Sequence, residues 1–205
     1  QGRGWITLPG QQILLSVVVD SPFAPHWLVM AASVSALDAL ASVGVTDDRM
    51  GIKWPNDILI EDRKVAGILI ETTGNSSKLT GVVGIGMNVN GSLALWPEIA
   101  ARATTLEDAA HHPFEREAII IAYMQSLGAI HTQLVADAGG MAKEHLWARW
   151  RKRLVTLGRA TTVHQGDHLL TGITEDVASD GALVLRSDDG SRTLITWGDV
   201  ESAGG

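Results

Sequence analysis

The stretch Lys53–Glu71, KWPNDILIEDRKVAGILIE, places polar side chains that can do chemistry between short apolar runs. Asn56 and Asp57 supply hard oxygen ligands of the kind that hold Mg²⁺ beside phosphates. Lys64 supplies a flexible point charge, which can follow an oxygen atom whose charge changes during a reaction. Each residue also has an ordinary interpretation, because Pro-Asn-Asp favours a turn and a lysine in DRK can lie in solvent. The residues alone leave both interpretations open.

Short strands must position this cluster. MGIKW predicts a strand that Pro55 stops. DILIE and VAGILIE predict two strands joined by DRK as a hairpin. TGVVGIGMNVN, Thr80–Asn90, predicts a further strand in which glycine recurs, and glycine in a strand often marks a close approach to the backbone. For Gly67, Gly84 and Gly86, a ligand-binding wall and close strand packing are both open.

The flanking segments predict helices and a second, β-rich region. Gln11–Asp20 is an apolar strand, and Pro25–Val43 is a helix with Gly44 just past its end. A long amphipathic helix is predicted after Pro113, with helical spacing of Ile120, Met124, Leu127, Ile130 and Leu134. A second helix follows a Gly-Gly break, and an Ala-, Thr- and Pro-rich loop precedes the first.

The C-terminal part changes pattern. From Leu154 the chain shows short alternating runs with SDG and DDG turns, which predict a small β-barrel or meander. We therefore predict an α+β fold with a mixed β-sheet and helices over residues 1–153, followed by a small barrel over 154–205. Hairpins in place of strict βαβ alternation disfavour a Rossmann fold.

The composition sets the broad class. The 205 residues are 45% hydrophobic and 19% charged, as in ordinary globular proteins. The net charge of -7 argues against a general nucleic-acid binder. The chain has no cysteine, which excludes disulfides and thiolate metal sites and agrees with a cytoplasmic location. No apolar run approaches the roughly 20 residues of a membrane span, and no signal peptide is visible.

Several segments, in this order, resemble the biotin protein ligase family. They are GRGW at Gly2–Trp5, KWPND at Lys53–Asp57, RKVAGILIE at Arg63–Glu71 and GIGMNV at Gly84–Val89. The β-rich tail is similar to the family's SH3-like C-terminal domain, so the resemblance covers nearly the whole chain. It implies a class II synthetase-like biotin/lipoate ligase catalytic domain over 1–153 and an SH3-like barrel over 154–205. The family's upstream ligand motifs have no counterpart here, so we expect an N-terminally incomplete catalytic domain.

The resemblance implies an ATP-dependent biotin–[acetyl-CoA-carboxylase] ligase. Such an enzyme activates biotin as biotinyl-5′-AMP and transfers it to a lysine of a biotin carboxyl carrier domain. Catalysis of this kind is mostly alignment and charge neutralisation. The implied small molecules are ATP, Mg²⁺ and biotin, and the implied protein partner is the carrier domain. Neither a membrane nor a nucleic acid is implied for this chain, and a homodimer is allowed.

The resemblance also implies roles for particular residues. The implied catalytic residues are Lys64, Asp57 and Asn56, with Asp57 as the Mg²⁺ ligand. The implied biotin-binding residues are Gly2, Arg3, Lys64 and Gly67. The implied ATP- and adenylate-binding residues are Arg3, Trp5, Asn56, Gly84, Gly86 and Asn88. Trp5 would stack on adenine, and Trp54 is expected to pack beneath the site.

Other functions remain open at this point. A lipoate or octanoate ligase of the same superfamily would share much of the pattern. A non-catalytic biotin-binding or repressor-like protein would bind the ligand without forming the adenylate. A fragment with only a scaffold role would not be stabilised by biotin, because a ligand raises stability only by binding the folded state.

Overall fold

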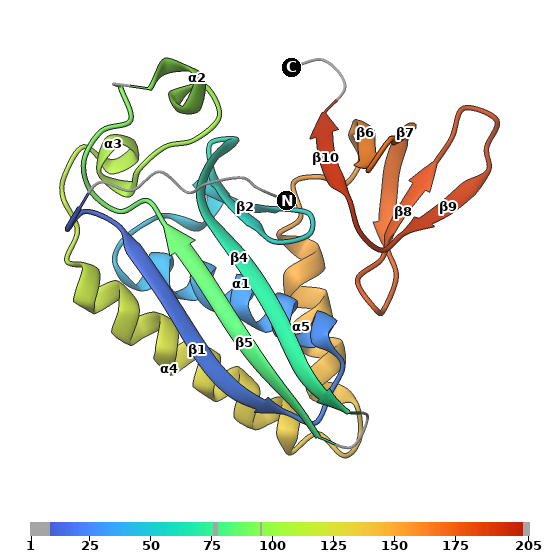
Figure 1. The fold of residues 1–205 in the computed structure, drawn as a ribbon, viewed down its shortest axis with the longest axis horizontal. Coiled ribbons are helices and arrows are strands. Elements are labelled where there is room, and N and C mark those ends of the chain that lie inside the picture. Colours follow the sequence, from blue (N-terminus) through green and yellow to red (C-terminus); the bar gives the residue numbers. More distant parts are fainter. Residues whose placement is uncertain (1–8, 76–77, 95, 203–205) are drawn as a thin grey trace.

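The computed structural model describes residues 9–75, 78–94 and 96–202. In these ranges the strands form two five-stranded antiparallel sheets. Figure 1 shows the larger sheet with helices behind it and the smaller sheet to one side, near the C-terminus. This arrangement confirms the predicted α+β class with a C-terminal β domain.

The larger sheet has the strand order β1-β5-β4-β3-β2. Its strands are β1 (Ile13–Ser21), β2 (Met50–Lys53), β3 (Asp57–Ile60), β4 (Arg63–Asn75) and β5 (Lys78–Met87). The helices are α1 (Pro25–Ser42), α4 (Arg116–Val135) and α5 (Met141–Lys152), with the shorter η1 (Asp47–Arg49), α2 (Pro97–Ala100) and α3 (Leu106–Ala110). Among the residues that the structure describes, the long helices cover one face of the sheet and no helix covers the other, which we call the uncovered face (Figure 1).

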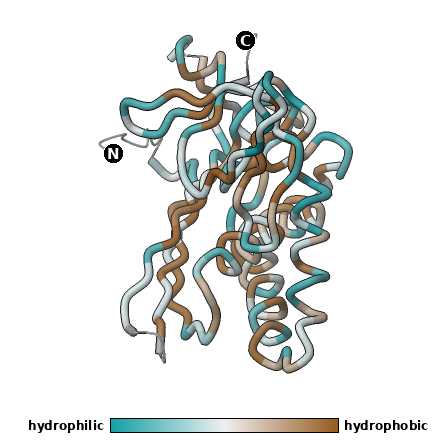
Figure 2. Tube along the Cα trace, turned by 90° about the vertical axis from the view of Figure 1, so that its right-hand side faces the viewer, coloured by the Kyte–Doolittle hydropathy of each residue, from teal (hydrophilic) through white to brown (hydrophobic). Residues whose placement is uncertain are grey.

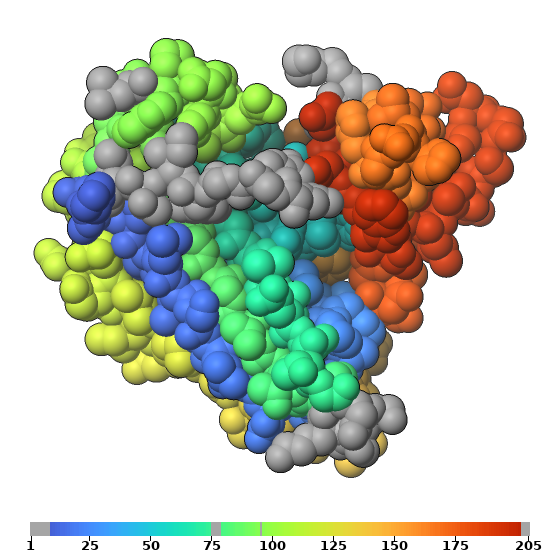
Figure 3. All heavy atoms as spheres, viewed as in Figure 1, coloured from blue at the N-terminus to red at the C-terminus, as the bar shows by residue number. Residues whose placement is uncertain are grey.

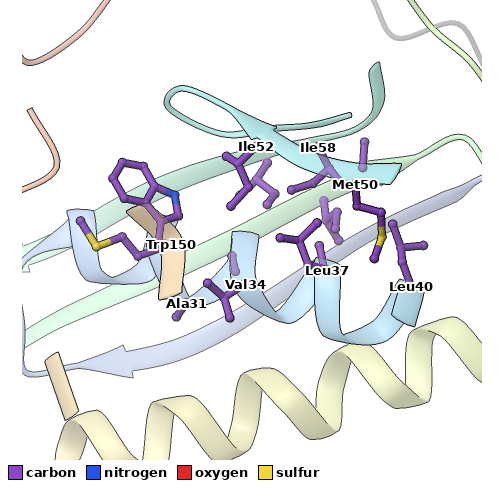
Figure 4. Close-up of a cluster of buried hydrophobic side chains, with 14 of the residues drawn as sticks. Ala31, Val34, Leu37, Leu40, Met50, Ile52, Ile58 and Trp150 are labelled. Atoms are coloured by element: carbon purple, nitrogen blue, oxygen red, sulfur yellow. The ribbon is translucent and has the colours of Figure 1, made fainter. Parts of the chain in front are cut away.

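Helix α1 forms the centre of the core. It is buried nearly all round, as expected of a helix enclosed on every side. Figure 4 shows its side chains Val34, Leu37 and Leu40 pointing toward Met50 and Ile52 of β2. Figure 2 shows the matching pattern, with hydrophobic residues along the sheet strands and hydrophilic ones at the outer turns. The sheet is therefore rigidly backed on one side.

Helix α4 packs on α1 through a different stripe from the predicted one. Leu127, Ile130 and Leu134 are buried as predicted, but Ile119 and Tyr123 are buried in place of Ile120 and Met124. Met124 is 38% exposed. Both stripes satisfy helical spacing, and the position of α1 decides which one faces the core. The prediction was wrong for Met124, whereas Ile120 is partly buried and packs against the core.

The same helix corrects a second expectation. Arg116–Val135 is long and apolar enough, by length and composition alone, to cross a membrane, whereas no such run was expected. In this fold its buried stripe packs on α1. Core helices of globular proteins often have the same length and apolar composition as membrane spans. These two properties of α4 are therefore no evidence for a membrane.

The hairpin turn lies earlier than predicted. Glu61 and Asp62 form it, with positive φ angles of 49° and 63°, as in the two-residue turns that match strand twist. Arg63 and Lys64 therefore belong to β4 and not to the turn. The next predicted strand also shifts, because β5 ends at Met87. Part of the predicted loop after it forms the short helices α2 and α3.

The second sheet has the strand order β10-β6-β7-β8-β9. Its strands are β6 (Ala160–Gln165), β7 (His168–Val177), β8 (Leu183–Arg186), β9 (Arg192–Ile195) and β10 (Asp199–Ser202). Helix α5 ends at Lys152 and β6 begins at Ala160, so the predicted boundary after Arg153 falls in the connection between the two sheets. We refer to the second sheet and its turns as the C-terminal domain.

Candidate active site

The uncovered face of the larger sheet carries a cavity of about 410 Å³. Figure 3 shows this face, with β1, β5 and β4 side by side. The cavity is lined by residues of β1, β3, β4 and β5, and by Asn56, the residue before β3. They are Leu14, Leu15, Ser16, Asn56, Asp57, Lys64, Gly67, Ile68, Leu69, Gly84, Ile85 and Gly86.

Strand register explains why the sheet is hollow here. Gly86 pairs with Leu14 on one side and with Gly67 on the other. Gly84 pairs with Leu69 in the next row. Residues two apart in a strand share a face, so Gly84 and Gly86 leave the last part of β5 without side chains on the uncovered face. We call this hollow, with Gly67, Gly84 and Gly86 at its floor, the glycine trough.

Apolar side chains flank the glycine trough. Leu14 on β1 is 64% exposed and Leu69 on β4 is 61% exposed, although both lie on a well-ordered sheet. Large side chains this exposed on either side of a bare floor make a groove for an apolar ligand. The trough can therefore take an apolar molecule along the strands.

A β-bulge places Lys64 on this face. Ile58 pairs with Ala66 and Leu59 pairs with Lys64, so β4 carries one extra residue, Val65. Val65 and Ala66 are both fully buried. Lys64 and Gly67 are three residues apart, so in a regular strand they would lie on opposite faces. The bulge brings both onto the uncovered face.

Lys64 and Asp57 form the charged end of the site. Lys64 Nζ lies 2.6 Å from Asp57 Oδ1, and the two side chains are 35% and 24% exposed. A Cβ atom on Gly67 would lie only 3.0 Å from Lys64 Nζ and 3.4 Å from Asp57 Oδ1. A side chain at Gly67 would therefore displace the pair. The cation, the carboxylate and the trough form one continuous site.

Asn56 is fixed by β4. Its Nδ2 donates a hydrogen bond to the Ile68 carbonyl, and its own carbonyl accepts one from the Ile68 amide at 3.1 Å. Asn56 also lines the cavity. The two bonds hold the segment that leads into Asp57, so both polar side chains are positioned by the same neighbour.

Trp54 does not pack beneath this site. It is 3% exposed, and its Nε1 donates a 2.8 Å hydrogen bond to the Gly181 carbonyl in the C-terminal domain. The Trp54–Pro55 peptide bond, which follows, is cis. The expectation was wrong because the ring lies between the two domains. Spacing within one motif does not reveal a partner 127 residues away.

The structure brings together six of the predicted site residues. Asn56, Asp57, Lys64, Gly67, Gly84 and Gly86 all line the cavity. Asn88 lies apart from it, 6% exposed, and its Nδ2 donates to the Thr104 carbonyl at 3.2 Å. The remaining predicted residues, Gly2, Arg3 and Trp5, lie outside the described residues.

Sequence reasoning expected apolar strands to form a wall for the ligand, but it named neither Leu14 nor Leu69. The signal was present in β1, whose run ILLSVVV is apolar on both faces. A strand covered on one face only should alternate between apolar and polar residues. Apolar residues on both faces therefore indicate a second apolar contact, which here is the trough.

The sequence and the fold both have counterparts among known proteins. Residues 1–88 match the biotin/lipoate A/B protein ligase family, and residues 156–201 match the biotin protein ligase C terminal domain. The biotin–[acetyl-CoA-carboxylase] ligase of Mycobacterium tuberculosis is 35% identical, covering 97% of this chain and 72% of that protein. The bifunctional ligase/repressor of Escherichia coli is 28% identical, and this chain spans 58% of its length.

A solved structure shows the same fold. The biotin protein ligase from Aquifex aeolicus, in complex with biotin and ATP, superposes with a TM-score of 0.81. It is 22% identical, and the match covers 98% of this chain and 83% of that one. On the 35% identity shared along almost its whole length, the chain belongs to the biotin protein ligase family.

Proposed function

We propose that the chain carries the catalytic site of an ATP-dependent biotin–protein ligase. The observation that carries this proposal is the Lys64–Asp57 pair at one end of the glycine trough. The names of the relatives support it, since those from Mycobacterium tuberculosis and Paracoccus denitrificans are biotin–[acetyl-CoA-carboxylase] ligases. The proposed product is biotinyl-5′-AMP, from which biotin passes to a lysine of a biotin carboxyl carrier domain.

Lys64 addresses the main barrier of the first step. A carboxylate oxygen of biotin attacks the α-phosphorus of ATP, and the bond from that phosphorus to pyrophosphate breaks. Both reactants are anions, so a cation between them lowers the barrier by neutralising charge that develops. Lys64 Nζ is partly exposed at the cavity wall and can reach such an oxygen. In the second step the acceptor amine attacks the biotinyl carbonyl, and AMP leaves.

The glycine trough suits the apolar part of biotin. Its volume of about 410 Å³ lies within the range of small-molecule sites. Gly84 and Gly86 let the ligand approach the backbone of β5, and Leu14 and Leu69 contact it from the sides. The biotin carboxylate would then point toward Lys64, where the reacting groups meet.

Asp57 and Asn56 are the proposed phosphate-side residues. Asp57 would hold Mg²⁺, which commonly uses one or two carboxylates together with substrate phosphates. Bound there, the ion would supply further neutralisation of phosphate charge. Among the residues that the structure describes, no cluster of three or more acidic or histidine side chains could hold a metal alone. This agrees with a metal site completed by the nucleotide.

The proposal includes further parts that rest on the family resemblance. Gly2 and Arg3 would close over biotin and phosphate, and Trp5 would stack on adenine. Asn88 would contact the adenylate, as the resemblance implies, and its side-chain amide also donates a hydrogen bond to the Thr104 carbonyl. A homodimer and a cytoplasmic location also belong to the proposal.

Biotin-dependent exchange between pyrophosphate and ATP tests the first step. The assay would contain Mg²⁺ and compare biotin with lipoate, because the matching family model covers both kinds of ligase. We expect exchange with biotin and not with lipoate. Exchange with lipoate alone would identify a lipoate ligase, and biotin binding without exchange would identify a non-catalytic or repressor-like protein. The assay is run on the 205-residue chain.

A further inference from the structure

The C-terminal domain contacts the segment that delivers the polar site residues. The Trp54 amide donates to Thr156 Oγ1 at 2.9 Å, and Trp54 Nε1 donates to the Gly181 carbonyl at 2.8 Å. Trp54 and Thr156 are 3% and 5% exposed. These buried hydrogen bonds end two residues before Asn56. The position of the C-terminal domain is therefore linked directly to the start of the site.

The connection between the domains reinforces this contact. The Ile52 amide donates to the Arg153 carbonyl at 2.8 Å, and the Val155 amide donates to the Ile52 carbonyl at 3.0 Å. A Cβ atom on Gly51 would lie 2.2 Å from Val155 Cγ1, so the Val155 side chain packs directly on the backbone of Gly51. Strand β2 is thus held along its length by residues 153–155, directly before Thr156.

Thr156 is itself held by the second sheet. Thr174 of β7 is fully buried, and its Oγ1 donates to the Thr156 carbonyl. The chain of contacts therefore runs from β7 through Thr156 to Trp54. At the far end of β3, Arg159 Nη2 lies 3.1 Å from Asp62 Oδ1, but both side chains are exposed.

An exposed ion pair of this kind contributes little to stability. The buried Trp54 is therefore the better candidate for connecting the C-terminal domain to the polar site residues.

We infer that the C-terminal domain positions Asn56 and Asp57 for adenylate formation, through Trp54 held by Thr156 and Gly181. The inference rests on the proposed function. On one side, Asn56 is hydrogen-bonded to Ile68 of β4. On the other side, the buried indole of Trp54 is hydrogen-bonded to Gly181 of the C-terminal domain. Displacements of about 1 Å at a reacting centre can cost about 100-fold in rate. Trp54 and Thr156 are therefore positioning residues, acting through Asn56 and Asp57.

The chain offers a matched control for this role. Trp147 of α5 donates from Nε1 to the Ala178 carbonyl at 3.0 Å, which is the same kind of bond to the same turn of the C-terminal domain. It lies on a helix and not beside the site. Trp54→Phe and Trp147→Phe each remove one indole N–H from the interface. If the contact only stabilises the protein, the two variants should behave alike.

Steady-state kinetics of biotin-dependent pyrophosphate–ATP exchange, measured on the 205-residue chain, test the inference. For Trp54→Phe we expect kcat to fall about tenfold or more with KM for biotin changed less than about twofold, because the trough itself is untouched. For Trp147→Phe we expect wild-type kinetics. Thr156→Val should reproduce the kcat loss, and Thr156→Ser, which keeps the hydroxyl, should restore it. Equal activity in the two tryptophan variants would overturn the inference.

Amide hydrogen exchange separates this inference from the proposed function. We expect faster exchange in residues 56–60 for Trp54→Phe and Thr156→Val, and unchanged exchange there for Trp147→Phe. This readout needs no substrate, so it holds even if the wild-type protein fails to form the adenylate. Unchanged protection of residues 56–60 in all three variants would show that the C-terminal domain does not position this segment.

Discussion

The two faces of the larger sheet are built in opposite ways from the same strands. Toward the helices, β5 presents Val83 and Met87, which are 0% and 1% exposed. Toward the uncovered face it presents Gly84 and Gly86, which have no side chains. A sheet that packs one face this closely does not leave the other bare through poor folding. Bare backbone flanked by exposed apolar residues suits an apolar ligand, in agreement with the proposed function.

Charge divides the two faces in the same way. The Lys64–Asp57 pair lies on the uncovered face, whereas the side chains between the sheet and α1 are apolar. Burial of apolar area stabilises the helix-covered face. The uncovered face contributes less to folding and more to binding. Substitutions on the uncovered face should therefore lower activity more than stability, and substitutions on the helix-covered face should lower stability more than activity.

The largest effect is expected for Lys64→Ala. Removing the cation should slow biotin-dependent pyrophosphate–ATP exchange by about 100-fold to 1,000-fold, the usual loss for a group that stabilises developing charge. Thermal stability should stay near wild type, because the Lys64 side chain is 35% exposed. Lys152→Ala at the end of α5 is the control, since it removes an exposed lysine far from β4. Near-normal exchange in Lys64→Ala would remove the basis of the proposed function.

Gly84→Val should have the second largest effect, and it should weaken the binding of biotin. A Cβ atom there would lie 3.5 Å from the Leu69 carbonyl oxygen, an ordinary contact, so the free protein should accept the change. The valine side chain would fill the floor of the glycine trough. We expect biotin to bind about ten- to 100-fold more weakly, which corresponds to about 1.4–2.7 kcal/mol. Titration calorimetry and thermal unfolding measure the two quantities, and unchanged biotin affinity would place the ligand elsewhere.

Gly81→Ala tests the opposite face of the same strand. A Cβ atom on Gly81 would lie 2.5 Å from Leu28 Cδ1, and Leu28 is 1% exposed. Overpacking of this kind should cost about 1–3 kcal/mol of unfolding free energy, while biotin affinity stays unchanged. Urea unfolding measures the loss. Adding Leu28→Ala should show coupling between the two sites, because the variants share one contact. A loss of affinity without a loss of stability would contradict the contrast between the faces.

Much of this site could be predicted from local motifs. The KWPND and RKVAGILIE segments predict the cluster of Asn56, Asp57 and Lys64 through their resemblance to the ligase family, whereas the residue types alone left a turn and a solvent-exposed lysine open as well. The face on which each residue lies is harder to predict, since it depends on pairing between strands. The bulge at Val65 reverses the alternation expected for Lys64. The partner of Trp54 lies in the other domain, beyond the reach of spacing or periodicity.

Tyr123→Phe gives the smallest expected effect at neutral pH and tests the helix-covered layer. Tyr123 is 2% exposed, and within the described part of the chain its hydroxyl has no hydrogen-bond partner. Burial raises the pKa of this phenol above its ordinary value. Removing the unpaired hydroxyl should leave stability at pH 7 equal to wild type or raise it by up to about 1 kcal/mol.

The pH dependence follows from the same burial. Above about pH 10 the unfolded chain loses the phenol proton while the folded protein keeps it, so the unfolded state binds fewer protons. Wild-type stability should then fall by about 1.4 kcal/mol per pH unit from this residue. Tyr123→Phe should lack that part of the alkaline loss, as urea unfolding at pH 7 and pH 11 would show. The same alkaline slope in both proteins would mean that the phenol reaches water, and that α4 packs on the core less closely than the 2% exposure of Tyr123 indicates.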